Sequence, residues 1–517
     1  MRCDGGMDVV LQADRPLSEA ELVEVARHGA PVEISPESLD RLRTARAHVD
    51  AMAASSTPVY GISTGFGALA TRHIPGELRT QLQRSLVRSH AASSGDEVEA
   101  EVVRGLMLLR LQTMTTGRTG VRPETASAYA ALLNAGITPV VREFGSLGCS
   151  GDLAPLAHAA LAVMGEGDVR VDGTAMSAGE ALERARIVPV VLAEKEGLAL
   201  INGTDGMLAM LMLACADLDR LVRTADLTAA MSLEALLGTD RVLAEDLMAM
   251  RPHPGQQTAA ANMRRLLAGS PLVASHRGPE DTRVQDAYSI RCAPQVAGGL
   301  RDTLAYARGV AAREAASAID NPVLLADGRL ESNGNFHGAP IAYVLDFLAI
   351  PIADVASISE RRTDRMLDPN RSHGLPAFLA HDPGVDSGLM IAQYTQAGLV
   401  SELKRLAAPA SVDSIPSSAM QEDHVSMGWA AGRKLRRAVD GLTRVLAIEL
   451  MTAARALDLR VPLAAAPATA AAVGALREAV PGAGPDRYLT PEIEAVVSLV
   501  RSGAVLAAAE GVTGPLE

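Results

Sequence analysis

The chain has 517 residues, of which 48% are hydrophobic and 21% are charged, so it can bury a large core and is too apolar to be disordered. Its net charge of -13 and its 3% content of aromatic residues exclude the usual basic, stacking surface of a nucleic-acid-binding protein. Residues 1–13 contain no signal-peptide core, and the apolar runs 207–216 and 461–476 are too short or are broken by proline. We therefore expect a cytoplasmic protein that binds neither nucleic acid nor membrane.

The cysteines and several absent motifs exclude other classes of site. Cys3, Cys149, Cys215 and Cys292 lie far apart without a C-x-x-C pair, which argues against disulfides and fits a reducing compartment. There is no G-K-[ST] phosphate-binding loop, and there is no H-E-x-x-H or similar metal-ligand cluster. We predict that the protein requires no metal.

Helix start signals dominate the N-terminal part of the chain. Ser18 begins a capping box with Glu21 that predicts a helix over residues 17–27, and Ser35 before Pro36 predicts a helix that runs to about residue 54. Asp96 is expected to cap a third helix that ends near residue 117.

The remaining sequence predicts long helices, the first of which, over residues 206–237, is apolar nearly all round. These cover residues 206–237, 297–318, 339–366, 389–406 and 427–457. Strand patterns are short and few, as at residues 8–12 and 169–171. The predicted fold is mainly α, a long-helix bundle (201–517) with a smaller N-terminal loop-and-helix portion (1–200).

The most informative loop runs from Gly145 to Pro155. Its composition alone favours a glycine-rich turn before a helix that is capped by Asp152. However, the tripeptide Cys149-Ser150-Gly151 permits a reaction of the backbone. The amide nitrogen of the glycine is sterically free to attack the cysteine carbonyl carbon, and dehydration that includes the serine hydroxyl leaves an electrophilic methylidene-imidazolone. The positive end of the following helix favours electron flow into such a ring.

The segment from Gly145 to His158 resembles the signature of the histidine and aromatic amino acid ammonia-lyases. The resemblance implies a 4-methylidene-imidazol-5-one that forms autocatalytically from Cys149, Ser150 and Gly151, with no external cofactor. Most members carry alanine at the position of Cys149, whose side chain the ring closure does not consume. Members are typically homotetramers whose active sites take loops from three subunits, so a homotetramer with shared sites is implied for this chain.

The segment from Tyr60 to Gly67 resembles the tyrosine loop of the same family, with Ser63 in place of the usual asparagine. The resemblance implies that Tyr60 acts as a general base. Taken alone, Gly65-x-Gly67-x-x-Ala70 would also fit a dinucleotide-binding fingerprint. That reading fails because no buried strand precedes the glycines and no acidic residue lies near Ser85.

Three further loops resemble family motifs in the family's order. The loop 200–204 implies that Asn202 hydrogen-bonds at the electrophile, and the loop 333–338 implies that Phe336 forms a wall beside a flat substrate. The loop 285–292 implies roles for Gln285, Tyr288 and Arg291, and the planar guanidinium of the arginine suits a carboxylate. Without the family pattern, each residue would be an ordinary helix-entry, core or ion-pair residue.

Glu422 and His90 favour one substrate within this family. The segment 421–427 resembles the histidine-acting branch, and His90 lies where that branch places a histidine near the substrate ring. A carboxylate and an imidazole offer hydrogen bonds to an imidazole ring, whereas neither suits a phenyl ring. The hypothesis is the non-oxidative deamination of L-histidine to trans-urocanate and ammonia, by attack of either the substrate amine or its ring on the electrophile.

Two other interpretations remain open from the sequence. The first is a tyrosine or phenylalanine ammonia-lyase or an aminomutase with the same electrophile, against which Glu422 argues. The second is a non-catalytic helical assembly protein, which does not explain six polar loops that match one family in order. A hydrolase that uses Ser150 or Cys149 is weaker still, because the loop lacks the G-x-S-x-G spacing.

Overall fold

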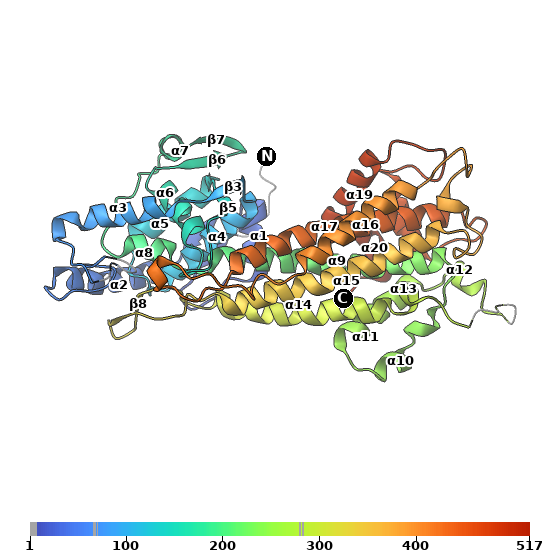
Figure 1. The fold of residues 1–517 in the computed structure, drawn as a ribbon, viewed down its shortest axis with the longest axis horizontal. Helices are drawn as coiled ribbons and strands as arrows, with labels where there is room; N and C mark the ends of the chain where they lie inside the picture. Colours follow the sequence, from blue (N-terminus) through green and yellow to red (C-terminus); the bar gives the residue numbers. More distant parts are fainter. Residues whose placement is uncertain (1–7, 66–68, 70, 279–280, 282–283) are drawn as a thin grey trace. The chain divides into compact units, whose positions relative to one another are not determined.

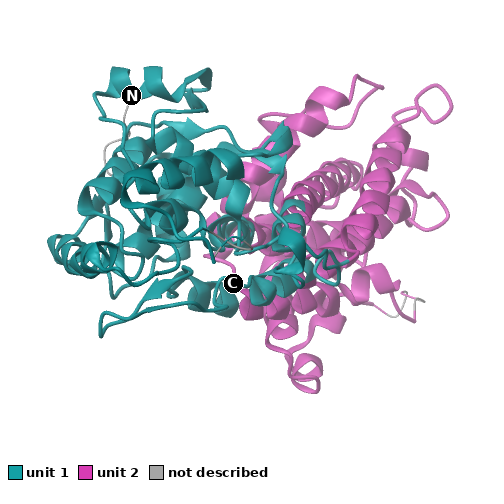
Figure 2. Cartoon of the chain, turned by 60° about the vertical axis from the view of Figure 1, so that its left-hand side comes forward, with its two compact units in different colours: residues 1–216, 308–346, 409–433 teal, residues 217–307, 347–408, 434–517 magenta. Residues whose placement is uncertain are grey.

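The computed structural model describes residues 8–65, 69, 71–278, 281 and 284–517, and most of these residues are helical (Figure 1). The prediction of a mainly α chain with long helices is confirmed. The chain forms two compact units, and neither is continuous in sequence (Figure 2). Unit 1 contains residues 1–216, 308–346 and 409–433, and unit 2 contains residues 217–307, 347–408 and 434–517. The sequence-based division into residues 1–200 and 201–517 stays a prediction.

Unit 1 contains short helices and all of the strands in the described part of the chain. Its helices are α1 (Glu19–His28), α2 (Pro36–Ala54), α3 (Arg79–His90), α4 (Ala100–Thr115), α5 (Pro123–Asn134), α6 (Leu153–Val163), α7 (Ala178–Ala185) and α8 (Glu196–Ile201), with 3-10 turns η2 (Gly76–Leu78) and η5 (Ser418–Met420). Its strands are β1 (Val9–Leu11), β2 (Val32–Ile34), β3 (Ser94–Glu97), β4 (Thr138–Pro139), β5 (Arg142–Phe144), β6 (Asp168–Val171), β7 (Thr174–Ser177), β8 (Val323–Leu324) and β9 (Leu330–Glu331). Strands β1 and β2 are parallel, whereas β3-β5, β4-β6-β7 and β8-β9 are antiparallel.

The described residues of unit 2 form helices and loops without a strand. Its helices are α10 (Glu245–Ala249), α11 (Pro254–Leu266), α12 (Pro271–Ala274), α13 (Tyr288–Arg291), α16 (Met390–Leu406), α18 (Pro467–Arg477), α19 (Thr490–Ser502) and α20 (Ala504–Thr513), with 3-10 turns η3 (Asp240–Leu243) and η4 (Ala377–Leu379). Four long helices contribute residues to both units: α9 (Asp205–Ala235), α14 (Ala293–Ala315), α15 (Ala339–Leu367) and α17 (Gly428–Asp458).

The N-terminal helix signals act as predicted at α1 and α2. The backbone N–H of Glu21 donates to Ser18 Oγ at 3.2 Å, and the glutamate accepts from the Ser18 backbone N–H at 2.9 Å, which completes the capping box. At α2, Ser35 Oγ accepts from the backbone N–H of Ser38, and Pro36 occupies the first turn. The predicted cap at Asp96 is wrong, because this residue lies in β3 and α4 begins only at Ala100. Strand β3 pairs with β5 instead, with a register shift between Ser94 and Glu97.

The first part of α9 is buried on every face, as the apolar pattern of residues 206–237 predicts. Along α9, the consecutive residues Met207 to Cys215 are all at most 3% exposed. Helix α15 is long and apolar enough to span a membrane by composition, but 61% of its most apolar window is buried inside the protein. Such burial is typical of a core helix.

Three helices of unit 1 bring distant loops together. Helices α3, α6 and α8 all pack against one another. His90 is the last residue of α3, Gly151 comes shortly before the first turn of α6, and Asn202 directly follows α8. The fold therefore carries three of the predicted site segments on one packed group of helices.

Candidate active site

The Cys149-Ser150-Gly151 segment forms a tight turn between β5 and α6. Ser150 has φ 50°, and the glycines on either side of the turn, Gly148 and Gly151, have φ 85° and 82°. The backbone N–H of Gly151 donates to the carbonyl oxygen of Gly148 at 3.3 Å. A left-handed serine is strained, and such conformations concentrate at functional sites. The turn thus directs the glycine amide nitrogen back along its own chain.

The loop after α8 holds this turn from one side. The backbone N–H of Asp152 donates to the carbonyl oxygen of Gly203 at 2.7 Å, and the Gly203 N–H donates to the carbonyl oxygen of Ser150 at 3.2 Å. A Cβ atom at Gly151 would lie 1.9 Å from the Gly203 oxygen, so only glycine fits. Asn202, which is 2% exposed, lies next to this contact, and its side-chain amide donates to the Leu198 carbonyl oxygen at 3.1 Å.

Arg110 on α4 holds the Asn202–Gly203 loop through backbone carbonyl oxygens. Its side chain is fully buried and donates to the carbonyl oxygens of Ala199, at 3.2 Å, and of Asn202. A further bond reaches the Ile319 carbonyl oxygen at 3.0 Å, and Asp205, the first residue of α9, pairs with the guanidinium at 3.1 Å. One arginine therefore binds both the end of α8 and the start of α9.

Asp152 is buried beside the turn, and burial raises the pKa of its carboxyl group to about 7. It accepts hydrogen bonds from the Met207 backbone N–H at 2.8 Å and from Ser146 Oγ at 3.0 Å. The prediction that its side chain caps α6 is wrong, because the carboxylate makes no capping bond there. It binds the first turn of α9 instead, whose free N–H groups attract a carboxylate.

Glu422 lies close to the tripeptide and to His90. Ser417 Oγ is 3.0 Å from Glu422 Oε2 and 3.0 Å from Cys149 Sγ. Burial lowers the pKa of His90 and outweighs its attraction to the Glu422 charge, while His90 Nδ1 donates to the Leu86 carbonyl oxygen at 2.9 Å. Burial also raises the pKa of the Cys149 thiol. The structure thus brings the predicted imidazole-binding pair within electrostatic reach of each other.

Tyr60 and Phe336 lie on two loops that are tied to the start of α8. Gly61, directly after Tyr60, packs so closely on α8 that a Cβ atom would lie 2.8 Å from Leu198 Cδ1. Phe66 and Gly67, at the end of the predicted tyrosine loop, lie outside the described residues. On the other loop, Asn333 donates to the Asp320 backbone oxygen at 3.0 Å, and the Asp320 carboxylate pairs with the buried Lys195.

Gln285, Tyr288 and Arg291 belong to unit 2. The Arg291 guanidinium carbon lies 4.5 Å from the centre of the Tyr288 ring, a cation–π geometry, and the tyrosine is 71% exposed. The Arg291 Nε atom is buried without a hydrogen-bond partner among the residues that the structure describes. A stacked arginine that retains unsatisfied donors suits an anionic ligand.

Comparison with known proteins settles the family. The family described as aromatic amino acid lyase matches residues 17–478. The chain belongs to the aromatic amino acid lyase family. It is 65% identical to a histidine ammonia-lyase of Streptomyces avermitilis over 99% of this chain and 100% of that protein.

Solved structures of the aromatic amino acid lyase family share the backbone of this chain. A tyrosine aminomutase from Streptomyces globisporus has a TM-score of 0.94 at 35% identity, covering 99% of this chain and 100% of the other. A histidine ammonia-lyase from Trypanosoma cruzi has a TM-score of 0.90 at 39% identity, covering 98% and 96%. Two different reactions thus share this backbone, so the side chains must decide the substrate.

Sequence reasoning missed several residues that lie in or beside this candidate site. Arg110 lies between buried leucines of an apolar helix, and that anomaly could have marked it, whereas nothing in the sequence distinguishes Ser417. His337 and His424 also form a stacked pair, with ring centres 5.6 Å apart and planes 6° apart. His337 lies in the loop 333–338 and His424 in the segment 421–427, but the stacking of their rings depends on the fold.

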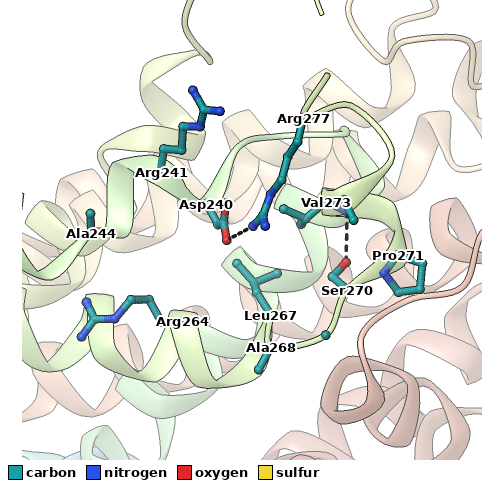
Figure 3. Close-up of a pocket in the computed structure, with 12 residues that line it drawn as sticks. Asp240, Arg241, Ala244, Arg264, Leu267, Ala268, Ser270, Pro271, Val273 and Arg277 are labelled. Carbon is teal, nitrogen blue, oxygen red and sulfur yellow. Dashed lines mark hydrogen bonds and ion pairs between the residues drawn. The ribbon is translucent and has the colours of Figure 1, made fainter. Parts of the chain in front are cut away.

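A separate cavity in unit 2 contains none of the predicted site residues. It has a volume of about 690 Å³, and Asp240, Arg264, Ser270 and Arg277 are among its lining residues (Figure 3). Arg277 pairs with Asp240, Arg264 donates to a backbone carbonyl, and Ser270 accepts from the Val273 N–H. These four polar side chains thus already have partners within the protein.

Proposed function

We propose that this chain is a histidine ammonia-lyase, which converts L-histidine to trans-urocanate and ammonia. The observation that carries the proposal is the position of Glu422, which is linked through Ser417 to Cys149 of the tripeptide turn and whose charge acts on His90. A carboxylate and an imidazole complement both nitrogens of a substrate imidazole, whereas a phenol or phenyl ring would leave them unsatisfied. The 65% identity to a protein named histidine ammonia-lyase supports the same substrate.

The tripeptide suits the ring closure that the proposal requires. The turn at Ser150 points the Gly151 amide back along the chain, and the absence of a Cβ atom leaves that nitrogen open to a carbonyl carbon. The resulting 4-methylidene-imidazol-5-one would supply an electron-poor carbon that activates the substrate for loss of ammonia. The Gly203 backbone holds the turn in place through its bonds to Ser150 and Asp152, and no external cofactor is proposed.

The other predicted site residues have proposed roles in binding the substrate or in moving its proton. Arg291 binds the carboxylate with its guanidinium, Tyr60 removes the β-proton, and Phe336 packs against the ring. Glu422 and His90 bind the imidazole. The remaining predicted residues orient the substrate and the tripeptide, namely Asn202, Gln285 and Tyr288.

We further propose a cytoplasmic homotetramer in which neighbouring subunits share active-site loops. The family resemblance suggests this assembly, and large side chains exposed on α14, α15 and α16 support an interface. Tyr306 is 57% exposed, Ile350 is 51% exposed and Tyr394 is 60% exposed. The described cysteines, Cys149, Cys215 and Cys292, are free thiols, which fits a reducing compartment, and Cys3 lies outside the described residues.

The second candidate is a tyrosine lyase or aminomutase, because the tyrosine aminomutase shares the backbone at a TM-score of 0.94. Purified protein should be supplied with histidine, tyrosine or phenylalanine while the unsaturated acid is followed by absorbance. We expect kcat/KM for histidine to exceed that for the other two by at least about 100-fold, since a site built for polar groups rejects analogues that lack them.

Intact mass provides an independent measurement on the same protein. We expect the active chain to be lighter by two water molecules, as ring closure at Cys149-Ser150-Gly151 requires. Activity on tyrosine alone would show that tyrosine, and not histidine, is the substrate. A chain of full mass without activity would support a non-catalytic assembly protein.

A further inference from the structure

A chain of hydrogen bonds links the tripeptide to Glu422, the carboxylate that is proposed to bind the substrate ring. Ser417 Oγ lies 3.0 Å from Cys149 Sγ on one side and 3.0 Å from Glu422 Oε2 on the other. Along the sequence, Ser417 is 268 residues from Cys149 and 5 residues from Glu422, so only the fold places the three side chains together. Ser417 is half-buried between its two partners.

The single proton of the hydroxyl gives this chain a direction. An ionised Glu422 can only accept, so Ser417 Oγ–H must donate to it, and the thiol of Cys149 must then donate to the serine oxygen. Burial raises the pKa of Cys149 and keeps the sulfur in the thiol form that this direction needs. A hydrogen bond to an ionised carboxylate is roughly twice as strong as a neutral one.

The backbone around Ser417 also holds Glu422. The Ser417 N–H donates to the Glu422 carbonyl oxygen at 3.0 Å, and the Glu422 N–H donates back at 3.4 Å. Between these two residues the chain turns through three consecutive left-handed residues, Ser418, Ala419 and Met420, with φ between 52° and 69°. Such a turn is strained for side chains other than glycine and persists only where its surroundings impose it. Ser417 thus binds both the backbone and the carboxylate of Glu422.

We propose that Ser417, supported by the Cys149 thiol, is a positioning residue that orients the Glu422 carboxylate toward the substrate ring. Ser417 occupies Oε2, and the other oxygen, Oε1, is the one that binds the imidazole. Cys149, whose side chain takes no part in ring closure, thereby acquires a function in substrate recognition. The inference rests on the proposed function, since it concerns how Glu422 binds histidine.

The test compares Ser417→Ala with Ser414→Ala in the full-length protein. Ser414 lies on the same loop and its hydroxyl accepts only from the Val425 backbone N–H, at 2.9 Å, so it is a matched control. We expect Ser417→Ala to raise KM for histidine at least about tenfold with kcat changed less than about threefold, because the lost bond involves a charged group. Ser417→Thr, which keeps the hydroxyl, should restore KM to within about threefold of wild type.

Cys149→Ala tests the outer end of the chain. We expect a rise in KM of about two- to fivefold, and no further rise when the change is added to Ser417→Ala, because both act through one hydrogen-bond chain. Intact mass should show the two-water loss in every variant.

The inference is overturned if mature Ser417→Ala protein keeps the wild-type KM, if Ser414→Ala raises KM equally, or if Ser417→Ala protein does not mature. A wild-type protein that matures but does not act on histidine would instead overturn the proposed substrate. A wild-type protein of full mass would overturn the electrophile.

Discussion

Buried charged side chains bind different kinds of groups in the two units: backbone carbonyls in unit 1 and other side chains in unit 2. In unit 1, Arg110 is bonded to carbonyl oxygens at the ends of helices and in the loops beside the tripeptide turn. In unit 2, Glu449 on α17 accepts from Ser232 on α9 at 2.7 Å, from Ser359 on α15 at 2.6 Å and from Arg362 at 2.8 Å. The first group fixes a loop, whereas the second joins three helices along their length.

The difference shows that a buried charged side chain can have either of two structural roles, to hold a loop or to join helices. A guanidinium among loop carbonyls fixes backbone that has no regular hydrogen-bonding pattern of its own, so its loss should disturb local geometry. A charge between helix faces leaves the helices intact when it is removed, so its loss should appear as global instability. Three measurements can break or sharpen this comparison.

The largest effect is expected from Arg362→Met in unit 2. The change leaves Glu449 buried without its cationic partner, and loss of one member of such a pair costs about 3–5 kcal/mol. Chemical denaturation should show this loss, while the folded protein should still show the two-water mass deficit. Arg184→Met, which removes an exposed ion pair in α7, should change the free energy of unfolding by less than about 1 kcal/mol. A normal stability with impaired maturation would reverse the comparison.

A smaller but more local effect is expected from Arg110→Met in unit 1. We expect the fraction of chains lighter by two waters to fall at least about tenfold, because the Asn202–Gly203 loop loses bonds worth about 1.5–3 kcal/mol each. Arg104→Met is the control on the same helix, since Arg104 also lies on α4, is half-buried and donates to the carbonyl oxygens of Val25 and Leu133. Equal loss of maturation in both variants would show that α4 stability alone is responsible.

The smallest effect concerns the pH dependence of stability through Asp152. Its pKa is raised from 3.8 to about 7 in the folded chain, so the folded state retains a proton that the unfolded state loses. This contribution is fully present below pH 3.8 and is lost as the pH rises through 7. Between pH 6 and pH 8 it should cost about 1.4 kcal/mol. The free energy of unfolding of wild type should fall by that amount relative to Asp152→Asn, and parallel curves would refute the assignment.

Local signals in the sequence predicted those parts of the fold that depend on neighbouring residues. Ser18 and Ser35 marked their helices because a cap bonds to backbone within three residues. Asp152 carries the same kind of signal, but its carboxylate binds Met207, 55 residues later, and long-range contact overrode the local preference.

The candidate site also contains both kinds of feature, some that depend on neighbouring residues and some that depend on long-range contacts. The tripeptide and its companion loops could be proposed from the sequence because each is a run of consecutive residues, such as Cys149-Ser150-Gly151. The supporting contacts of Arg110 and Ser417 span 92 and 268 positions, and no periodicity or spacing along the chain encodes them. A serine in a polar loop and an arginine in a helix acquire meaning only once the chain has folded.

The contact between Gly151 and Gly203 complicates the interpretation of mutagenesis at the tripeptide. Any residue other than glycine at position 151 would collide with a carbonyl oxygen of the neighbouring loop before its chemistry could be tried. An inactive Gly151→Ala protein would therefore be ambiguous evidence about how the electrophile forms. Replacing Ser150 while leaving both glycines in place would separate the chemical requirement from the spatial one.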